Sequence, residues 1–185
     1  NFLDLQIVWY ASLISFIGSN VSALKSENNA IFKKNFDFYI NVCNSIKDNA
    51  ISFTFSNYVM HHVVGEVNDK RMKNPEASNF ILSIYLLEPN NTRVKDNLKT
   101  LFEMLVREKT TGSKQAVSTI LSKVSSCNSS FYQELNTEYE AAQIDIELEN
   151  IFNKLKNNSI SKLNALQSIH GMYSSHPNNA VICQL

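Results

Sequence analysis

Glycine and proline are scarce in this chain, and their scarcity limits the folds open to it. There are four glycines and three prolines among 185 residues. The turns that join β-strands depend on the special backbone angles of these two residues, so an all-β domain of this length would need many more of them. Long helices need few turns. The composition therefore predicts an all-α protein.

The spacing of apolar residues supports a helical fold. Apolar side chains recur three and four residues apart along most of the chain, as on one face of a helix. The segment 50–66 also alternates like a strand in its first residues, but its helical surroundings favour a helix. We expect eight helices, over about 2–17, 22–47, 50–66, 74–87, 92–109, 113–127, 131–157 and 159–173.

The chain shows no linker and no internal repeat of 20–50 residues. The expected helices differ in length and in their turns, which disfavours a tandem-repeat solenoid. We predict a single helical domain over 1–185, folded as an irregular bundle of about seven or eight helices. In the last helix, Ile160, Leu163, Leu166 and Ile169 are expected to face inward. Residues 174–185 are expected to dock on the bundle as an extended tail.

The first expected helix, 2–17, is nearly all apolar and includes Trp9. The small residues Val21-Ser22-Ala23 behind it resemble a signal-peptidase site, but Asp4 stands where a signal peptide would carry a basic residue. Four polar residues interrupt the segment, which is short for a membrane span. We interpret it as a buried helix.

Charge and composition narrow the classes of partner. Seventeen basic and seventeen acidic residues cancel, so the basic excess typical of nucleic-acid binders is missing. The 24 asparagines and the excess of lysine over arginine, 14 to 3, are typical of an AT-rich genome. The remaining partner classes are another protein and an apolar small molecule.

Neither sequons nor cysteines fix the cellular compartment. Asn-X-Ser/Thr sequons begin at Asn20, Asn90, Asn128 and Asn157. Roughly this many are expected by chance, so they are no evidence of secretion. Three cysteines are too few for a disulfide scaffold. In a secreted protein, Cys127 and Cys183 are the expected pair, with Cys43 buried and reduced.

One cluster of side chains could bind a metal ion. On a helix, His62 and Glu66 share a face, and they could supply two ligands to a metal with His61 beside them. No second pair of this kind is evident. A half-buried histidine next to a solvated one is the simpler interpretation, and we assign no metal or cofactor residue.

The sequence contains cysteines and histidines that could form a catalytic pair, but no motif places them together. The candidates are Cys43, Cys127 or Cys183 with His170 or His176. Cys43 lies on the apolar stripe of its helix, where an inert buried thiol is the default. The chain has no Gly-x-Ser-x-Gly nucleophile motif and few glycines for a phosphate-binding loop. We therefore assign no catalytic residue.

Two further stretches have structural and functional interpretations. The acidic residues of 134–149 could bind calcium or serve acid–base chemistry, but their spread around a helix favours a solvated face. The aromatic residues of 32–58 could line a cavity for an apolar ligand, but a packed core is favoured.

These observations favour a non-enzymatic interaction protein, secreted or surface-displayed, from an AT-rich organism. One alternative is a helical carrier of a fatty acid or other apolar small molecule. Another is an intracellular helical adaptor, virus-encoded adaptors included.

Trp9 provides a test of the first helix. If this helix is buried, Trp9→Ala lowers the free energy of unfolding by about 3–5 kcal/mol, because a large core side chain is lost. Tryptophan fluorescence of the native protein checks the burial directly, since Trp9 is the single tryptophan. An emission maximum typical of exposed indole contradicts it.

Overall fold

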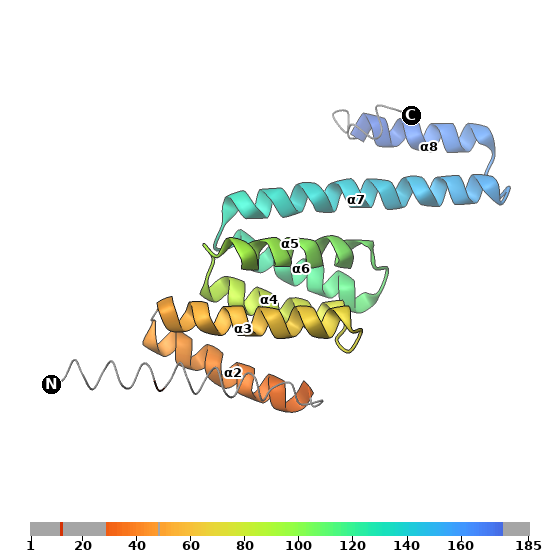
Figure 1. Ribbon diagram of the computed structural model, residues 1–185. Coiled ribbons are helices and arrows are strands. Elements are labelled where there is room, and N and C mark those ends of the chain that lie inside the picture. Colours follow the sequence, from red (N-terminus) through yellow and green to blue (C-terminus); the bar gives the residue numbers. More distant parts are fainter. Residues whose placement is uncertain (1–11, 13–28, 48, 176–185) are drawn as a thin grey trace.

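The computed structural model describes residues 12, 29–47 and 49–175, and every regular element in these ranges is an α-helix (Figure 1). This confirms the all-α class. The expected helix over 2–17 lies outside the described residues except for Ser12, and so do Trp9, Cys183 and residues 176–185. The described helices are α2 (Asn29–Ile46), α3 (Asn49–Asn68), α4 (Asn74–Leu87), α5 (Thr92–Arg107), α6 (Thr111–Ser125), α7 (Ser129–Lys156) and α8 (Lys162–Ser175).

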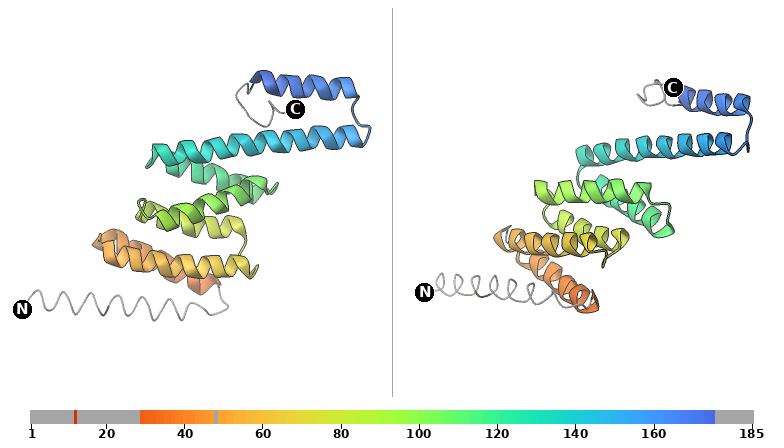
Figure 2. Two further views of the ribbon diagram at one scale, coloured as in Figure 1. Left: turned by 45° about the horizontal axis from the view of Figure 1, so that its top comes forward. Right: turned by 45° about the vertical axis from the view of Figure 1, so that its right-hand side comes forward.

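The helices stack in the order of the chain. Each substantial helix contact joins elements that are neighbours or next neighbours in sequence. Figures 1 and 2 show the same progression from α2 at one end to α8 at the other. Helix α4 is central, because it packs against α2, α3, α5 and α6. The result is an irregular bundle extended along the direction of stacking.

Most of the expected boundaries lie within a few residues of the observed ones. The segment 50–66 is helical and belongs to α3, and the range expected for α4 is the observed one. Side chains of Asn91, Thr110 and Asn128 cap α5, α6 and α7 by accepting a backbone N–H of the first turn. Lys47, Lys70 and Asn158 follow helix ends with φ of 54°, 58° and 56°. These non-glycine residues adopt the left-handed conformation that usually falls to glycine, in keeping with the scarcity of glycine.

The start of α4 differs from the pattern that its sequence suggests. Asn74 looks like an N-cap followed by proline, but Lys73 occupies the cap position and makes no side-chain cap bond. The Asn74 amide instead donates to the carboxylate of Glu108, behind α5. The other oxygen of that carboxylate accepts from Ser113 Oγ at 2.5 Å. Glu108 thereby fastens the start of α4 to the turn between α5 and α6.

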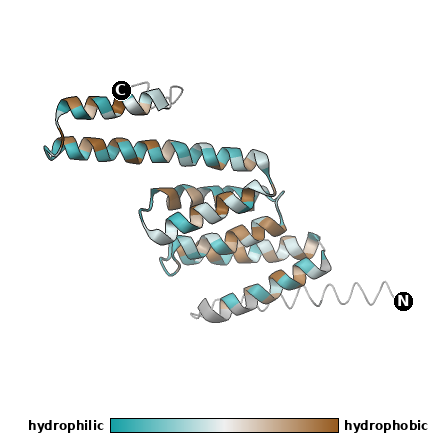
Figure 3. Cartoon of the chain, turned by 180° about the vertical axis from the view of Figure 1, so that it is seen from behind, coloured by the Kyte–Doolittle hydropathy of each residue, from teal (hydrophilic) through white to brown (hydrophobic). Residues whose placement is uncertain are grey.

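The main core lies between α2 and the first half of α7. Helix α5 contributes an apolar stripe of six residues whose spacing in the sequence is helical, and all six are buried: Val94, Leu98, Leu101, Phe102, Leu105 and Val106. Their 4, 3, 1, 3, 1 spacing places them on one side of the helix. Figure 3 shows hydrophobic colour concentrated on the central helices.

Helix α7 has different partners at its two ends. Near its start, Phe131 and Leu135 pack into the main core. Further along, Ile144, Leu148 and Ile151 pack against Ala165 and Met172 of α8 in a separate small cluster. The second half of α7 extends past the bundle, and α8 folds back along it (Figures 1 and 2). The apolar stripe of this long helix drifts around its axis, which predicts either a bend or a change of partners, and the structure has the change of partners.

Helix α8 departs from its prediction at both ends. It begins at Lys162 instead of 159, and Ser161 precedes it with a hydroxyl that accepts from Asn164 N at 3.1 Å. It also continues through Ser174 and Ser175, which were assigned to the tail. Their hydroxyls donate to the carbonyls of His170 and Gly171, so the extra residues remain compatible with the helix.

The two clusters predict two levels of local stability. Leu98→Ala removes a fully buried side chain of the main core and should cost about 2–5 kcal/mol, lowering amide protection across the bundle. Leu148→Ala should speed hydrogen exchange in α8 and leave α4 and α5 almost unchanged, because α7 is the one described helix on which α8 packs substantially. Equal loss of protection in α4 after both substitutions would contradict the division.

Candidate docking surface

Glu66 of the His61-His62-Glu66 cluster is held by an arginine. Its carboxylate accepts from Arg71 Nη2 at 2.7 Å and from Nε at 3.0 Å, and this pairing lowers the pKa of Glu66. Arg71 also contacts Asp69 Oδ2 at 2.7 Å. Both oxygens of Glu66 therefore face a guanidinium, an arrangement that pins the turn behind α3.

The two histidines differ in environment. His62 is partly buried, with its ring centroid 4.4 Å from that of Phe32, while His61 is exposed. Burial lowers the pKa of His62, and the negative charge of Glu66 partly opposes that shift. Within the part of the chain that the structure describes, no three His, Cys, Asp or Glu side chains gather as metal ligands would. His62 belongs to the edge of the aromatic core.

The cysteines that the structure describes sit apart from the histidines proposed for them. Cys43 is buried, and burial raises the pKa of its thiol, with Ser52 as a hydrogen-bond partner. Cys127 is an exposed thiol whose Sγ donates to the carbonyl of Val124 at 3.6 Å. His170 is exposed on α8. Cys183 and His176 lie outside the described residues, so the expected Cys127–Cys183 pairing stays a prediction.

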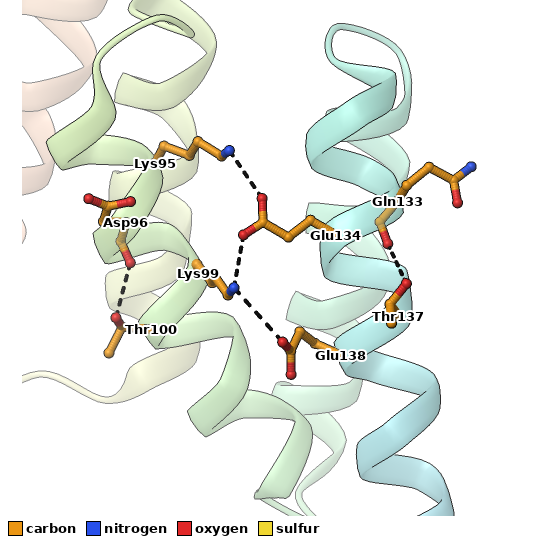
Figure 4. A network of polar contacts seen from close by, with 8 residues as sticks. All are labelled: Lys95, Asp96, Lys99, Thr100, Gln133, Glu134, Thr137 and Glu138. Carbon is orange, nitrogen blue, oxygen red and sulfur yellow. Dashed lines mark hydrogen bonds and ion pairs between the residues drawn. The ribbon is translucent and has the colours of Figure 1, made fainter. Parts of the chain in front are cut away.

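The acidic residues of 134–149 form interhelical ion pairs and a solvated face. Glu134 bridges Lys95 at 3.1 Å and Lys99 at 2.8 Å, joining α7 to α5 (Figure 4). Glu138 lies 3.8 Å from Lys99. The remaining acidic side chains of the stretch are exposed: Glu140, Asp145, Glu147 and Glu149.

The aromatic residues of 32–58 divide between core and surface. Phe32, Phe36, Tyr39 and Phe55 are buried, and ring contacts link them into one packed group. Phe80 of α4 completes the group with edge-to-face contacts, at 4.9 Å to Phe32 and 4.8 Å to Phe36. The exposed members are Phe38, Phe53 and Tyr58. These buried rings fill the space between helices α2, α3 and α4 themselves.

An open cleft lies where α7 leaves the bundle. It has a volume of about 460 Å³ and an apolar lining that includes Val106, Val117 and Ile146. Lys109 and Lys114 contribute to its polar lining. Lys109 Nζ is 3.6 Å from Glu149 Oε2, and both side chains are mostly exposed, so this ion pair beside the cleft is weak.

The largest concentration of exposed apolar side chains lies beyond the bundle. We call residues 144–175, the second half of α7 with α8, the arm. Of nine exposed large hydrophobic residues in the described part of the chain, the arm holds four. Phe152 and Tyr173 are each 45% exposed, and Leu163 and Leu166 are each 64% exposed. Figure 3 shows hydrophobic bands recurring along both helices.

Three of these side chains share one side of the arm, and Leu163 lies at its edge. Phe152, Leu166 and Tyr173 each follow a buried residue by one position, which turns them about 100° from the α7–α8 contact. The helices α7 and α8 are right-handed and run antiparallel. A position one residue after an inward residue of α7 and a position one residue after an inward residue of α8 therefore point to the same side of the pair. Leu163 lies close to Leu166, three residues earlier. We call Phe152, Leu163, Leu166 and Tyr173 the arm face.

The expectation that Leu163 and Leu166 face inward is wrong. The inward residues of α8 are Ala165, Ile169 and Met172. The sequence contains two apolar stripes with helical spacing, and the larger side chains suggested the wrong one. The small volume of Ala165 allows α8 to approach α7 closely, which a leucine at the contact would prevent. The small Ala165 between Leu163 and Leu166 is the sequence feature that could have indicated which stripe of α8 faces α7.

Charge is distributed unevenly along the arm face. Asp145 and Glu149 follow the buried Ile144 and Leu148 by one residue, so Asp145 lies on this side at the end nearer the bundle and Glu149 lies midway along it. Lys156 occupies the corresponding position at the far end of α7, and Lys162 opens α8 beside it. Helix α8 contains no acidic residue. The arm therefore has an acidic base and a basic tip.

Comparisons with known proteins assign no family. No family model, no curated protein and no solved structure matches this chain. None of the helices in the described residues is both long and apolar enough for a membrane crossing.

The lowered pKa of His62 predicts a dependence of stability on pH. The unfolded chain binds a proton at His62 at higher pH than the folded chain does, so the free energy of unfolding falls as the pH drops below about 6.5. Urea unfolding of wild type and His62→Gln at pH 7.5 and 5.5 measures this. The variant should lose less stability between these pH values than wild type, with His61→Gln as the exposed control. Equal losses in all three proteins would contradict the assignment.

Proposed function

We propose that this protein is a non-enzymatic interaction protein that binds another protein through the arm face. The observation that carries the proposal is the pair Leu163 and Leu166, each 64% exposed on a helix that already has a different buried face. Single exposed leucines are common on protein surfaces. Three large apolar side chains on one side of a projecting hairpin, with Leu163 at its edge, form a patch, and such patches mark interaction sites.

Energetics supports an external partner. Covering a leucine side chain completely yields about 1.5–3 kcal/mol. The hairpin cannot cover the arm face itself, since α7 and α8 already use their facing sides on each other. A helical surface with apolar residues at helical spacing fits the groove or helix face of another protein. The acidic base and basic tip would orient that partner.

The environments of Glu66 and Cys43 support the non-enzymatic part of this proposal. Glu66 is engaged by Arg71, and Cys43 is a buried thiol with a raised pKa, the reverse of an activated nucleophile. The proposal includes a secreted or surface-displayed location. In that setting the exposed Asn90 and Asn157, in turns after α4 and α7, are the accessible glycan acceptors.

A second candidate is the binding of a small amphipathic molecule in the cleft beside α7. Its volume of about 460 Å³ is in the range of ligand sites, and its apolar lining is accompanied by Lys109 and Lys114. An acyl chain with a carboxylate head fits that combination. The arm face remains the first candidate, because the cleft is open to solvent and Lys109 already faces Glu149.

Site-specific photo-crosslinking tests the protein-binding proposal. A benzophenone amino acid replaces Leu166 in the full chain, which is then exposed to the cells or fluid of its source and irradiated. Covalent adducts of defined mass are expected. The matched control is the same replacement at Asn164, which is exposed on the other flank of α8. Equal adducts at both positions, or none at Leu166, would refute a docking role for the arm face.

A further inference from the structure

We propose that the arm face binds the arm face of a second copy of this chain, with the two α8 helices antiparallel. This rests on the proposed function and names its partner. Two hairpins that meet through their open faces make a four-helix arrangement, the usual way in which helical pairs cover a second apolar stripe. Each arm already has its own small core, so it meets its partner as a formed unit.

Charge complementarity favours a second copy of the chain as the partner and favours antiparallel pairing of the two arms. In an antiparallel pair, the tip of each arm lies beside the base of the other. Lys156 and Lys162 of one copy then approach Asp145 of the other, and the arrangement repeats by symmetry. A parallel pair would bring tip against tip and base against base, with like charges opposed. The zero formal net charge of the chain adds no long-range repulsion between copies.

The apolar residues satisfy the same symmetry. A two-fold axis that crosses α8 midway between Leu163 and Tyr173 brings each of these residues opposite the other in the partner copy. Leu166 of each copy then lies beside His170 of the other. No charged residue of α8 stands between Leu163 and Tyr173, because Lys162 is its single lysine or arginine and it has no acid. The apolar centre is thus flanked at both ends by opposite charges.

The size of the surface sets the expected strength. Helix α8 has 14 residues, about 21 Å, and the arm face has four large apolar side chains. This is smaller than the standard protein interface of about 800 Å² per partner, so the association should be reversible and depend on concentration. We expect a dissociation constant in the micromolar range, not an obligate dimer.

Sedimentation of the full chain from about 1 to about 300 µM tests the association. The mass should rise from the 21.0 kDa monomer towards twice that value. Leu163→Gln with Leu166→Gln should weaken association roughly a hundredfold or more. Both side chains are already exposed, so the fold should survive, and circular dichroism checks this. Asn164→Ala with Ser168→Ala, on the other flank of α8, is the matched control and should dimerise normally.

Charge reversal tests the direction of pairing. Asp145→Lys alone should weaken self-association, and so should Lys156→Glu with Lys162→Glu alone. An equal mixture of these two proteins should associate again, because each tip then meets a base of opposite charge. Failure of the mixture to recover would overturn the proposed pairing.

Crosslinking in the purified protein identifies what covers the arm face. A benzophenone amino acid replaces Leu163, and unlabelled chain is mixed with ¹⁵N-labelled chain so that links between copies carry both isotopes. Links between copies into the region around Tyr173 support the antiparallel pair. Links between copies back to the region around 163 indicate a parallel pair, and links to 176–185 within one chain indicate its own tail. Either result overturns the inference.

A monomer at every concentration also overturns it. If Leu166 still captures a different protein from the source, the proposed function stands while the second copy is excluded as partner. If neither crosslinking experiment yields adducts, the proposed function and the proposed self-association both fail.

Discussion

Burial of one face of α5 is the contact on which the rest of the molecule depends. Leu98 and Phe102 are fully buried, and their helix packs on α4, α6 and α7. Each such side chain contributes about 1.5–3 kcal/mol relative to exposure. The amine of Lys95 lies 4.7 Å from the centre of the Phe131 ring and also contacts Glu134. Helix α5 therefore holds α7 by apolar burial, ion pairing and a cation–π contact, and it is α7 that carries the arm away from the bundle.

The helical class and most helix limits could be predicted from the sequence because they depend on local properties. Few glycines, apolar residues at helical spacing and capping side chains such as Asn128 and Thr110 act within a few residues of where they stand. The drifting apolar stripe of α7 is also a local property, and it left two alternatives: a bent helix or one with different partners at its two ends.

The arm face could not be predicted in the same way. The sequence of α8 offers Leu163 and Leu166 or Ala165 and Met172 as the inward side, and the choice depends on how closely α7 approaches. That distance is a tertiary property. Asn74 is a similar case, because its capping role was plausible until Glu108, 34 residues later, took its amide. The exposed side of α8 was not predicted because large apolar residues are ordinarily assigned to the core.

The sequential stacking of the helices has a consequence for how the protein is made. Among residues 29–47 and 49–175, each substantial contact joins helices no more than two places apart in the chain, so these helices can pack on one another without waiting for a distant described segment. Such local contacts favour rapid folding. They also allow the described helices to pack one after another while the chain is still being synthesised. On that schedule α4 and α5 are packed while α8 is still being synthesised. The apolar arm emerges after the helices of the bundle, so its exposed leucines have little opportunity to misdirect the assembly of the core.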